Sequence, residues 1–228
     1  MKRVLLSWSS GKDSAWSLHL LRATGDYEVV GLLTTFNGAA DRVAMHGVRR
    51  SLVKAQAKAA GLPLWDVDLP WPCSNDNYES AMRAVCERAL RSGVECIAFG
   101  DLFLTEIRDY REKQLRGTGL QPVFPVWGIP TDTLAHDMIA AGLRAKLTCV
   151  DGNQIPLRLA GRDFDEQLLI DLPAGADPCG ENGEFHSFVY AGPMFRHDIQ
   201  VNPGEIVLRD QFAFADFIPA QWLVLSKL

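Results

Sequence analysis

A run of small and charged residues close to the start of the chain has the chemistry needed to bind phosphate. Residues 7–14 read Ser-Trp-Ser-Ser-Gly-Lys-Asp-Ser. Small residues let backbone N–H groups turn toward an anion, and a helix behind the run would add unpaired N–H groups and the positive end of its dipole. Lys12 supplies a cation, and the hydroxyl groups of Ser10 and Ser14 supply further donors. The alternative is a tight turn in which Ser or Asp caps the helix.

Four charged residues follow the apolar run Cys96–Gly100 and could act on the same ligand. Asp101 comes directly after the run, where its carboxylate could hold Mg²⁺ or position a water molecule; the alternative is a helix N-cap. Arg108 and Arg111 could clamp phosphates or a carboxylate, with Glu112 orienting one of them. The alternative for these three residues is a solvated helix face with charge pairs.

A third group lies far along the chain, where residues 179–187 read Cys-Gly-Glu-Asn-Gly-Glu-Phe-His-Ser. On an extended segment, Glu184 and His186 share a face. Together with Glu181, they could bind a metal ion, recognise a cationic group or handle protons. A single Glu-x-His is weak evidence for a metal site, so these three readings stay open.

Strand-like and helix-like runs alternate through the first half of the chain and would position these groups. The predicted strands are Arg3–Trp8, Tyr27–Thr35, Leu64–Asp68 and Cys96–Gly100, and the predicted helices are Ser14–Ala23, Val48–Ala60 and Tyr78–Arg91. Helix-length connections imply parallel crossovers, so we predict an α/β fold with a doubly wound, Rossmann-like parallel sheet. The phosphate-binding run and Asp101 then lie at the same edge of the sheet, because each follows a strand.

The second half is less regular and indicates a smaller α+β domain. The segment Pro122–Pro130 carries three prolines and a glycine, which marks a break in the chain. We therefore divide the chain into domains 1–125 and 126–228. Beyond the break we predict a helix and three strands, at Thr131–Ala141, Lys146–Val150, Phe185–Ala191 and Glu205–Arg209.

The composition excludes several classes of protein. The chain has 228 residues, 47% of them hydrophobic and 22% charged, which are the proportions of a globular protein rather than of a disordered chain. No apolar run is long enough for a membrane helix, and Ser9 and Lys12 break the apolar start, so we expect no signal peptide and a cytoplasmic location. A net charge of −5 argues against a broad nucleic-acid surface. The five cysteines form no Cys-x-x-Cys pair, which argues against structural zinc or a disulfide scaffold.

The residues Ser9–Ser14 closely resemble the pyrophosphate-binding loop (PP-loop) of the adenine nucleotide alpha hydrolase superfamily, also called N-type ATP pyrophosphatases. That loop reads Ser-Gly-Gly-x-Asp-Ser, and this chain has Ser10 where many members have glycine. Further motifs resemble the diphthine–ammonia ligase family, from about residue 3 to residue 195; they are Met45–Val48, Phe99–Asp101, Arg108–Glu112, Phe124–Trp127, Cys179–Ser187 and Gly192-Pro193. The chain lacks the long C-terminal extension of eukaryotic ligases, so on this ground it resembles the short prokaryotic members.

The resemblance implies a HUP-type ATP-binding domain over 1–125, a substrate-binding domain over 126–228, and an activity in diphthamide biosynthesis. ATP would be split between its α and β phosphates, a carboxylate would become an adenylate, and ammonia would displace AMP. The implied nucleotide-binding residues are Ser9, Ser10, Gly11, Lys12, Asp13, Ser14, Thr34, Thr35, His46, Gly100 and Asp101. The implied substrate-binding residues are Arg108, Arg111, Glu112, Glu181, Glu184 and His186. The catalytic residues would be Lys12, Asp13, Glu184 and His186, with Mg²⁺ on Asp101.

The acceptor would be diphthine on a translation factor or a small metabolite, with ammonia free or delivered by a partner, and a homo-oligomer is compatible with the sequence. Two other functions stay open. An RNA-modifying relative would activate a base oxygen, but the acidic charge and unpaired cysteines count against it. A non-catalytic nucleotide sensor is the other, and the intact Lys12, Asp13 and Ser14 count against that.

Overall fold

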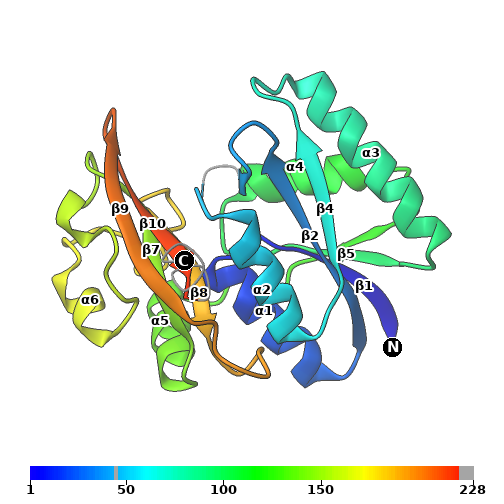
Figure 1. Ribbon diagram of the computed structural model, residues 1–228. Coiled ribbons are helices and arrows are strands. Elements are labelled where there is room, and N and C mark those ends of the chain that lie inside the picture. The colour runs from blue at the N-terminus through cyan, green and yellow to red at the C-terminus, as the bar shows by residue number, and fades with distance from the viewer. Residues whose placement is uncertain (44–45, 221–228) are drawn as a thin grey trace.

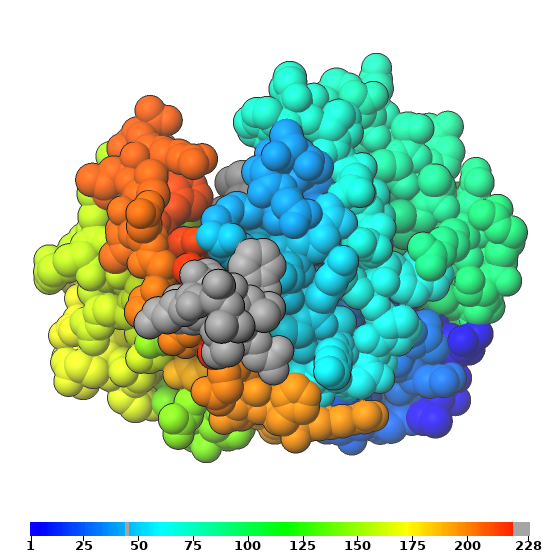
Figure 2. All heavy atoms as spheres, in the orientation of Figure 1, coloured from blue at the N-terminus to red at the C-terminus, as the bar shows by residue number. Residues whose placement is uncertain are grey.

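The computed structural model describes residues 1–43 and 46–220, which form two sheets with a cleft between their outer ends (Figures 1 and 2). The N-terminal sheet has six strands in the order β3-β2-β1-β5-β6, with β4 also paired to β2. All its pairings are parallel except β2 with β3. Its strands are β1 (Lys2–Ser7), β2 (Tyr27–Asn37), β3 (Arg42–Val43), β4 (Leu64–Leu69), β5 (Cys96–Ala98) and β6 (Gln121–Val123).

Helices cover both faces of this sheet, as the predicted doubly wound α/β fold requires. They are α1 (Lys12–Thr24), α2 (Arg50–Ala60), α3 (Asn75–Arg91) and α4 (Thr105–Leu115). Alternate residues of β1 enter different cores: Val4 and Leu6 pack with α1 and α2, whereas Leu5 packs with α3. This period of two is what a strand buried on both faces gives. The fold class predicted from the sequence is confirmed.

The chain order of the strands creates a crevice at one edge of the sheet. From β1 the chain moves to β2 and β4 on one side, and then returns to β5 and β6 on the other. The carboxyl ends of β1 and β5 therefore lie at the point where the order reverses, which is where open α/β sheets bind ligands.

The C-terminal part forms an antiparallel sheet of four strands in the order β8-β7-β10-β9. Its elements are α5 (Thr131–Ala140), β7 (Arg144–Asp151), a 3₁₀ turn (Leu157–Leu159), α6 (Glu166–Asp171), β8 (Phe185–Ala191), β9 (Val201–Arg209) and β10 (Phe212–Pro219). Helices α1 and α2 lie between the two sheets (Figure 1). One continuous hydrophobic core therefore joins both parts, from Leu6 through Leu18 and Leu52 to Phe188 and Val189.

The strands β3, β6 and β10 and the helix α6 were absent from the sequence prediction, and α4 appeared there only as the alternative for Arg108, Arg111 and Glu112. Strand β10 is the largest omission. Its buried positions include Ala213 and Ala215, and alanine gives a weak alternating signal. The predicted domain boundary at residue 125 falls between β6 and α5, where the chain leaves one sheet for the other. Residues 221–228 of the predicted second domain lie outside the described residues. No described helix combines the length and the apolar character that crossing a bilayer requires.

Candidate active site

The predicted phosphate-binding run forms a tight loop between β1 and α1. Gly11 is the N-cap residue of α1, and no side chain caps the helix. The hydroxyl groups bond within the loop instead: Ser9 Oγ accepts from Gly11 N at 3.3 Å, and Ser14 Oγ donates to Gly11 O at 3.0 Å. The alternative of a loop Ser or Asp that caps the helix is therefore excluded, and the positive end of the α1 dipole lies at the loop.

Ser10 adopts a backbone conformation that usually belongs to glycine. Its φ is +74°, in the left-handed region, and its side chain is fully buried. Two donors hold its carbonyl oxygen, Gln56 Nε2 at 3.0 Å and Val189 N at 3.0 Å. Its hydroxyl oxygen has no hydrogen-bond partner among the described residues. The departure from the glycine of the resembled motif thus falls at a position where a side chain adds backbone strain.

Gln56 is a structural residue of the site that the sequence analysis missed. It lies on α2 and is fully buried. Its Oε1 accepts from Trp8 Nε1 at 2.8 Å, and its Nε2 donates to the carbonyl oxygens of Ser10 and Val189. A polar residue on the apolar face of a predicted amphipathic helix is the signal that could have identified it.

Lys12 joins the loop to the C-terminal part of the chain. Its ammonium group pairs with Asp13 Oδ2 at 2.9 Å and donates to the carbonyl oxygen of Cys179. It also lies over the ring of Phe185, 5.3 Å from the centroid. Burial alone would lower the pKa of Lys12, but the neighbouring carboxylates of Asp13 and Glu181 outweigh it and raise that pKa. Lys12 is therefore a buried cation.

Ser187 is the second residue that the sequence analysis passed over, although it stands in a quoted motif. Its Oγ accepts a hydrogen bond from the backbone N–H of Lys12 at 3.1 Å. Gly11 packs directly against it, because a Cβ atom at Gly11 would lie 3.2 Å from the carbonyl oxygen of Ser187. Strand β8 thus fits closely against the phosphate loop.

The loop opens into a polar cavity of about 230 Å³, here called the phosphate-loop cavity, at the carboxyl ends of β1 and β5. Ten predicted site residues line it: Ser9, Lys12, Asp13, Ser14, His46, Gly100, Asp101, Arg111, Glu181 and His186. Seven others do not: Ser10, Gly11, Thr34, Thr35, Arg108, Glu112 and Glu184. The lining also includes residues not proposed from the sequence, namely Ser7, Phe99, Cys179, Gly180, Phe185 and Ser187.

Acidic side chains in this cavity would be stabilised by a bound cation. Burial raises the pKa values of Asp13 and Asp101, although Lys12 and Arg111 lie beside them. Burial also raises the pKa of Glu181 to about 7, against a hydrogen bond of 2.8 Å from Leu102 N to its Oε1. Asp13 Oδ1 is buried without a partner among the described residues. These groups suit Mg²⁺, which usually takes one or two carboxylates and completes its shell with phosphate oxygens.

The two arginines of the predicted charged group point to different places. Arg111 pairs with Asp101 at 3.4 Å and lines the cavity. Arg108 instead pairs with Glu112 at 2.9 Å, one turn along α4, and lies 4.8 Å from the centroid of the Trp127 ring. The charge-pair alternative therefore describes Arg108 and Glu112, whereas Arg111 belongs to the site.

Two neutral histidines form one wall of the cavity. The rings of His46 and His186 lie 4.4 Å apart between centroids. Burial lowers the pKa of His186 to about 4, and burial together with His186 lowers the pKa of His46. His46 Nδ1 has no partner among the described residues. Both rings are uncharged at neutral pH, so they are available as proton acceptors. Met45, which belongs to the same motif, lies outside the described residues.

Glu184 lies outside the cavity, although the sequence analysis placed it with His186. Its side chain is 2% exposed, and its Oε1 accepts from Asp177 N at 2.8 Å and from Asn182 Nδ2 at 3.2 Å. It precedes β8 and holds the turn that carries Glu181. Its partners are therefore those of a residue that shapes the turn.

Thr34 and Gly100 contact the loop from neighbouring strands. Thr34 Oγ1 donates to Trp8 O at 2.8 Å, which fixes the chain just before the loop, while Thr35 follows it in β2 beside β4. A Cβ atom at Gly100 would lie 3.0 Å from the carbonyl carbon of Asp13. Glycine here allows the end of β5 to approach the start of α1.

Comparison with known proteins identifies the family of this chain. The family model for the diphthamide synthase N-terminal domain matches residues 1–122, and the model for the diphthamide synthase C-terminal domain matches residues 130–218. A solved structure from Methanocaldococcus jannaschii, described as a predicted subunit of tRNA methyltransferase, covers 63% of this chain and 77% of its own, with 19% identity and a TM-score of 0.41. That likeness is too distant to bear on function.

Curated relatives carry the name diphthine–ammonia ligase. The Homo sapiens protein is 25% identical over 245 residues, covering 98% of this chain and 91% of the relative. The Danio rerio protein is 26% identical, and the match spans 95% of its length. The Schizosaccharomyces pombe protein is 24% identical, and the match spans 37% of its length. The expectation that a long extension separates this chain from eukaryotic relatives in general was therefore wrong. Because the two family models together span both sheets and both motifs of the cavity, this chain belongs to the diphthamide synthase family and is an enzyme of the ligase class, as expected from the sequence.

Proposed function

We propose that this protein is an AMP-forming ligase that activates a carboxylate with ATP and then amidates it with ammonia. The observation that supports this best is the meeting of two sequence motifs at one polar cavity. Loop 9–14 and segment 179–187 approach each other there through Lys12, which reaches the carbonyl oxygen of Cys179. A cation, a helix N-terminus and neutral proton acceptors then surround a space at the switch point of the sheet.

The reaction would run in two steps. In the first, a carboxylate oxygen of the acceptor attacks the α-phosphorus of ATP, the bond from that phosphorus to the bridging oxygen breaks, and pyrophosphate leaves. In the second, the nitrogen of ammonia attacks the acyl carbon, the bond from that carbon to the AMP oxygen breaks, and AMP leaves with the electron pair. The nitrogen gives up a proton, so the products are an amide, AMP, pyrophosphate and a proton.

The loop and its neighbours would bind the triphosphate. Ser9, Ser14 and the start of α1 line the cavity, and Lys12 and Arg111 would neutralise charge on the leaving pyrophosphate. Ser10 and Gly11 do not line the cavity and would act by shaping the loop that carries Lys12. Thr34 and Thr35 would lie toward the adenosine, at the carboxyl end of β2.

Magnesium fits the acidic residues of the cavity. Asp101, the residue proposed from the sequence, would hold it together with Asp13, whose Oδ1 has no partner in the described part of the chain. When bound, the ion would supply further charge neutralisation for the phosphates. The raised pKa of Glu181 allows this carboxyl to keep or lose a proton near neutral pH, so its charge can follow that of the ligand.

The neutral histidines would accept the proton released by ammonia. His186 lines the cavity beside the loop, and His46 stacks on it. We assign catalytic roles to Lys12, Asp13 and His186, and we assign to Glu184 the positioning of the turn that carries Glu181. The names of the relatives indicate diphthine as the acceptor. It would be carried on a translation factor, as the resemblance of the motifs implies, or a small metabolite would take its place, and the reaction would take place in the cytoplasm.

Exchange of labelled pyrophosphate into ATP tests the adenylation step alone. Purified protein, Mg-ATP, labelled pyrophosphate and a diphthine-bearing translation factor are incubated without ammonia. Adenylation predicts label in ATP that depends on the acceptor, because the first step then runs in both directions. Two results would contradict reversible adenylation of the acceptor. One is the appearance of labelled ATP when the acceptor is left out. The other is the absence of labelled ATP with a translation factor that the protein does amidate once ammonia is added.

A further inference from the structure

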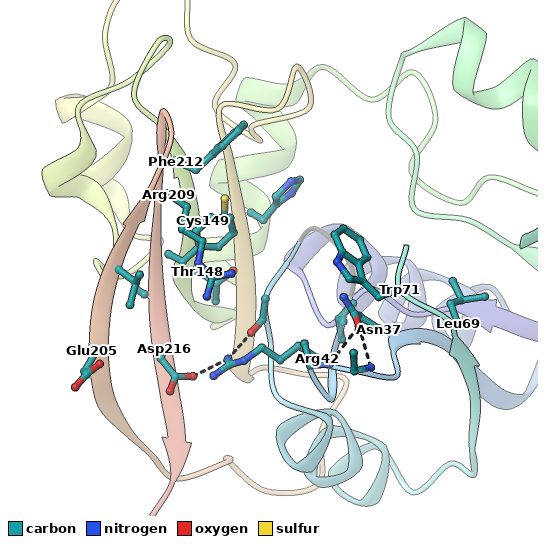
Figure 3. A pocket seen from close by; sticks show the side chains of 18 of the residues that line it. Asn37, Arg42, Leu69, Trp71, Thr148, Cys149, Glu205, Arg209, Phe212 and Asp216 are labelled. Carbon is teal, nitrogen blue, oxygen red and sulfur yellow. Dashed lines mark hydrogen bonds and ion pairs between the residues drawn. The ribbon is translucent and has the colours of Figure 1, made fainter. Parts of the chain in front are cut away.

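A second and larger cavity, here called the apolar cavity, lies between the two parts of the chain (Figure 3). Its volume is about 610 Å³. One wall comes from the end of β2, from β3 and from the loop 69–73, and the other comes from β7, β9 and β10. His186 lines both this cavity and the phosphate-loop cavity, so the two spaces meet at its ring.

Two polar atoms on the N-terminal wall, Asn37 Oδ1 and Arg42 Nη1, are already bonded within the protein. Arg42 donates to Asp216 Oδ1 at 2.8 Å and to Gly47 O at 2.6 Å. Asn37 Oδ1 accepts from the backbone N–H groups of Ala39 and Ala40. The rest of this wall is apolar and includes the side chain of Trp71, which is 72% exposed. The wall is therefore largely apolar, and Asn37 Oδ1 and Arg42 Nη1 are engaged within the protein.

Free polar capacity lies instead at the inner end, next to His186. Thr148 lines the apolar cavity from β7, is 3% exposed, and has no hydrogen-bond partner for its Oγ1 among residues 1–43 and 46–220. It neighbours Cys149, which pairs with His186 across β7 and β8. A buried hydroxyl without a partner costs free energy unless something else completes its bonding. The inner end thus calls for a polar group that residues 1–43 and 46–220 do not supply.

We propose that the apolar cavity receives the stem of the acceptor. The occupant is an elongated, apolar or aromatic arm with a polar tip that carries the carboxylate. The arm lies against Trp71 and Phe212, and the carboxylate at its tip bonds to Thr148 at the inner end, where His186 joins this cavity to the phosphate-loop cavity. This assignment rests on the proposed function, because that function supplies a carboxylate acceptor, and it adds that short hydrophilic carboxylates are poor acceptors.

Adenosine is the competing occupant, and the wall chemistry disfavours it. Recognition of a purine base uses donors and acceptors along its edge, whereas Asn37 Oδ1 and Arg42 Nη1 are bonded within the protein and most of this wall is apolar. The charged residues that remain in the lining, Glu205 and Arg209, occupy exposed positions of β9. A change in this cavity should lower ATP affinity if adenosine binds here, and should leave ATP affinity unchanged if the acceptor stem binds here.

The experiment uses 4-phenylbutyrate, an aromatic arm with a carboxylate tip, and acetate as the short hydrophilic counterpart. Binding of each to the full chain is titrated by calorimetry with a non-hydrolysable ATP analogue present. Two variants change the apolar cavity: Ala40→Trp fills it, and Thr148→Val removes the hydroxyl at nearly constant volume. Ala84→Trp, at an exposed position of α3 outside both cavities, is the control.

We expect 4-phenylbutyrate to bind and acetate not to bind. Ala40→Trp and Thr148→Val should each weaken the 4-phenylbutyrate complex by about tenfold or more, with ATP affinity unchanged, and Ala84→Trp should behave like the parent chain. Thr148→Val should also leave the melting temperature unchanged or raise it, since it removes an unpaired buried hydroxyl. This second readout shows that lost binding does not come from lost folding.

Other outcomes overturn the inference. No binding of 4-phenylbutyrate, equal binding by Ala40→Trp, or competition between 4-phenylbutyrate and ATP would each exclude an acceptor stem in this cavity. A drop in ATP affinity in Ala40→Trp would assign the cavity to adenosine. Failure of the proposed function gives a different result from failure of this inference. In that case 4-phenylbutyrate would bind as expected, but no acceptor would support the formation of AMP.

Discussion

The contacts of Gln56 predict that this residue controls both stability and nucleotide affinity. Substitution Gln56→Leu keeps the volume of the side chain but removes three buried hydrogen bonds, to Trp8, Ser10 and Val189. It leaves Trp8 Nε1 without its partner and the carbonyl oxygens of Ser10 and Val189 with one donor fewer. Each unpaired buried polar group costs about 1–3 kcal/mol, so we expect a loss of about 2–4 kcal/mol in the free energy of unfolding.

The effect on nucleotide binding follows from the backbone of Ser10. Its left-handed φ of +74° is maintained by two hydrogen bonds to its carbonyl oxygen, and Gln56→Leu removes one. A loss of about 1 kcal/mol in the preference for this loop conformation lowers ATP affinity about fivefold. A second substitution, Ser10→Gly, should restore that affinity in the Gln56→Leu background, because glycine adopts positive φ without a steric penalty.

Urea denaturation and calorimetric titration with ATP measure the two effects separately. Gln167→Leu, at an exposed position of α6, is the matched control and should change neither quantity appreciably. The reasoning is refuted if Gln56→Leu is as stable as the parent chain. It is also refuted if ATP affinity of the folded protein does not fall, or if it falls and Ser10→Gly fails to raise it again.

Three further predictions concern the phosphate-loop cavity. Gly100→Ala should destabilise the fold by about 1–3 kcal/mol, measured by urea denaturation, because the added Cβ lies 3.0 Å from the backbone of Asp13. Arg111→Ala should lower ATP affinity in calorimetry, whereas Arg108→Ala should leave it unchanged, since only Arg111 lines the cavity. Glu181→Gln should gain stability relative to the parent chain as pH rises from about 4.5 to about 7. The pKa of Glu181 is raised to about 7 in the folded state, so the folded parent binds more protons than the unfolded chain in that window and loses stability across it. The expected difference is about 2 kcal/mol, and parallel pH profiles of the two proteins would refute the assignment.

Local sequence patterns were enough to predict the sheet and the loop. The alternation of apolar runs and amphipathic helices places Ser9–Ser14 and Asp101 at adjacent strand ends, and the structure brings both into one cavity. A helix that carries Arg108, Arg111 and Glu112 was one of the alternatives that the sequence left open, and α4 is that helix. Spacing could not predict that Arg108 turns to Glu112 while Arg111 turns to the cavity, because that depends on where α4 crosses the end of β5.

Contacts between distant segments were beyond the reach of sequence reasoning. Gln56 and Ser187 bond to the loop across separations that only the packing of both sheets on α1 and α2 creates. Glu184 shows the opposite case, since its motif implied a place beside His186 while the turn at 177–182 uses its carboxylate. Residue type thus indicated the chemistry of the site, and tertiary packing decided which residues take part in it.

Nucleotide product analysis tests the central claim most directly. The protein is incubated with Mg-ATP, ammonium and a diphthine-bearing translation factor, and with each component left out in turn, alongside a Lys12→Ala variant. We predict AMP and pyrophosphate in equal amounts, together with an amidated acceptor, only when all components and Lys12 are present. Release of ADP and phosphate instead, or formation of AMP that does not depend on Lys12, would contradict the proposed use of the phosphate loop.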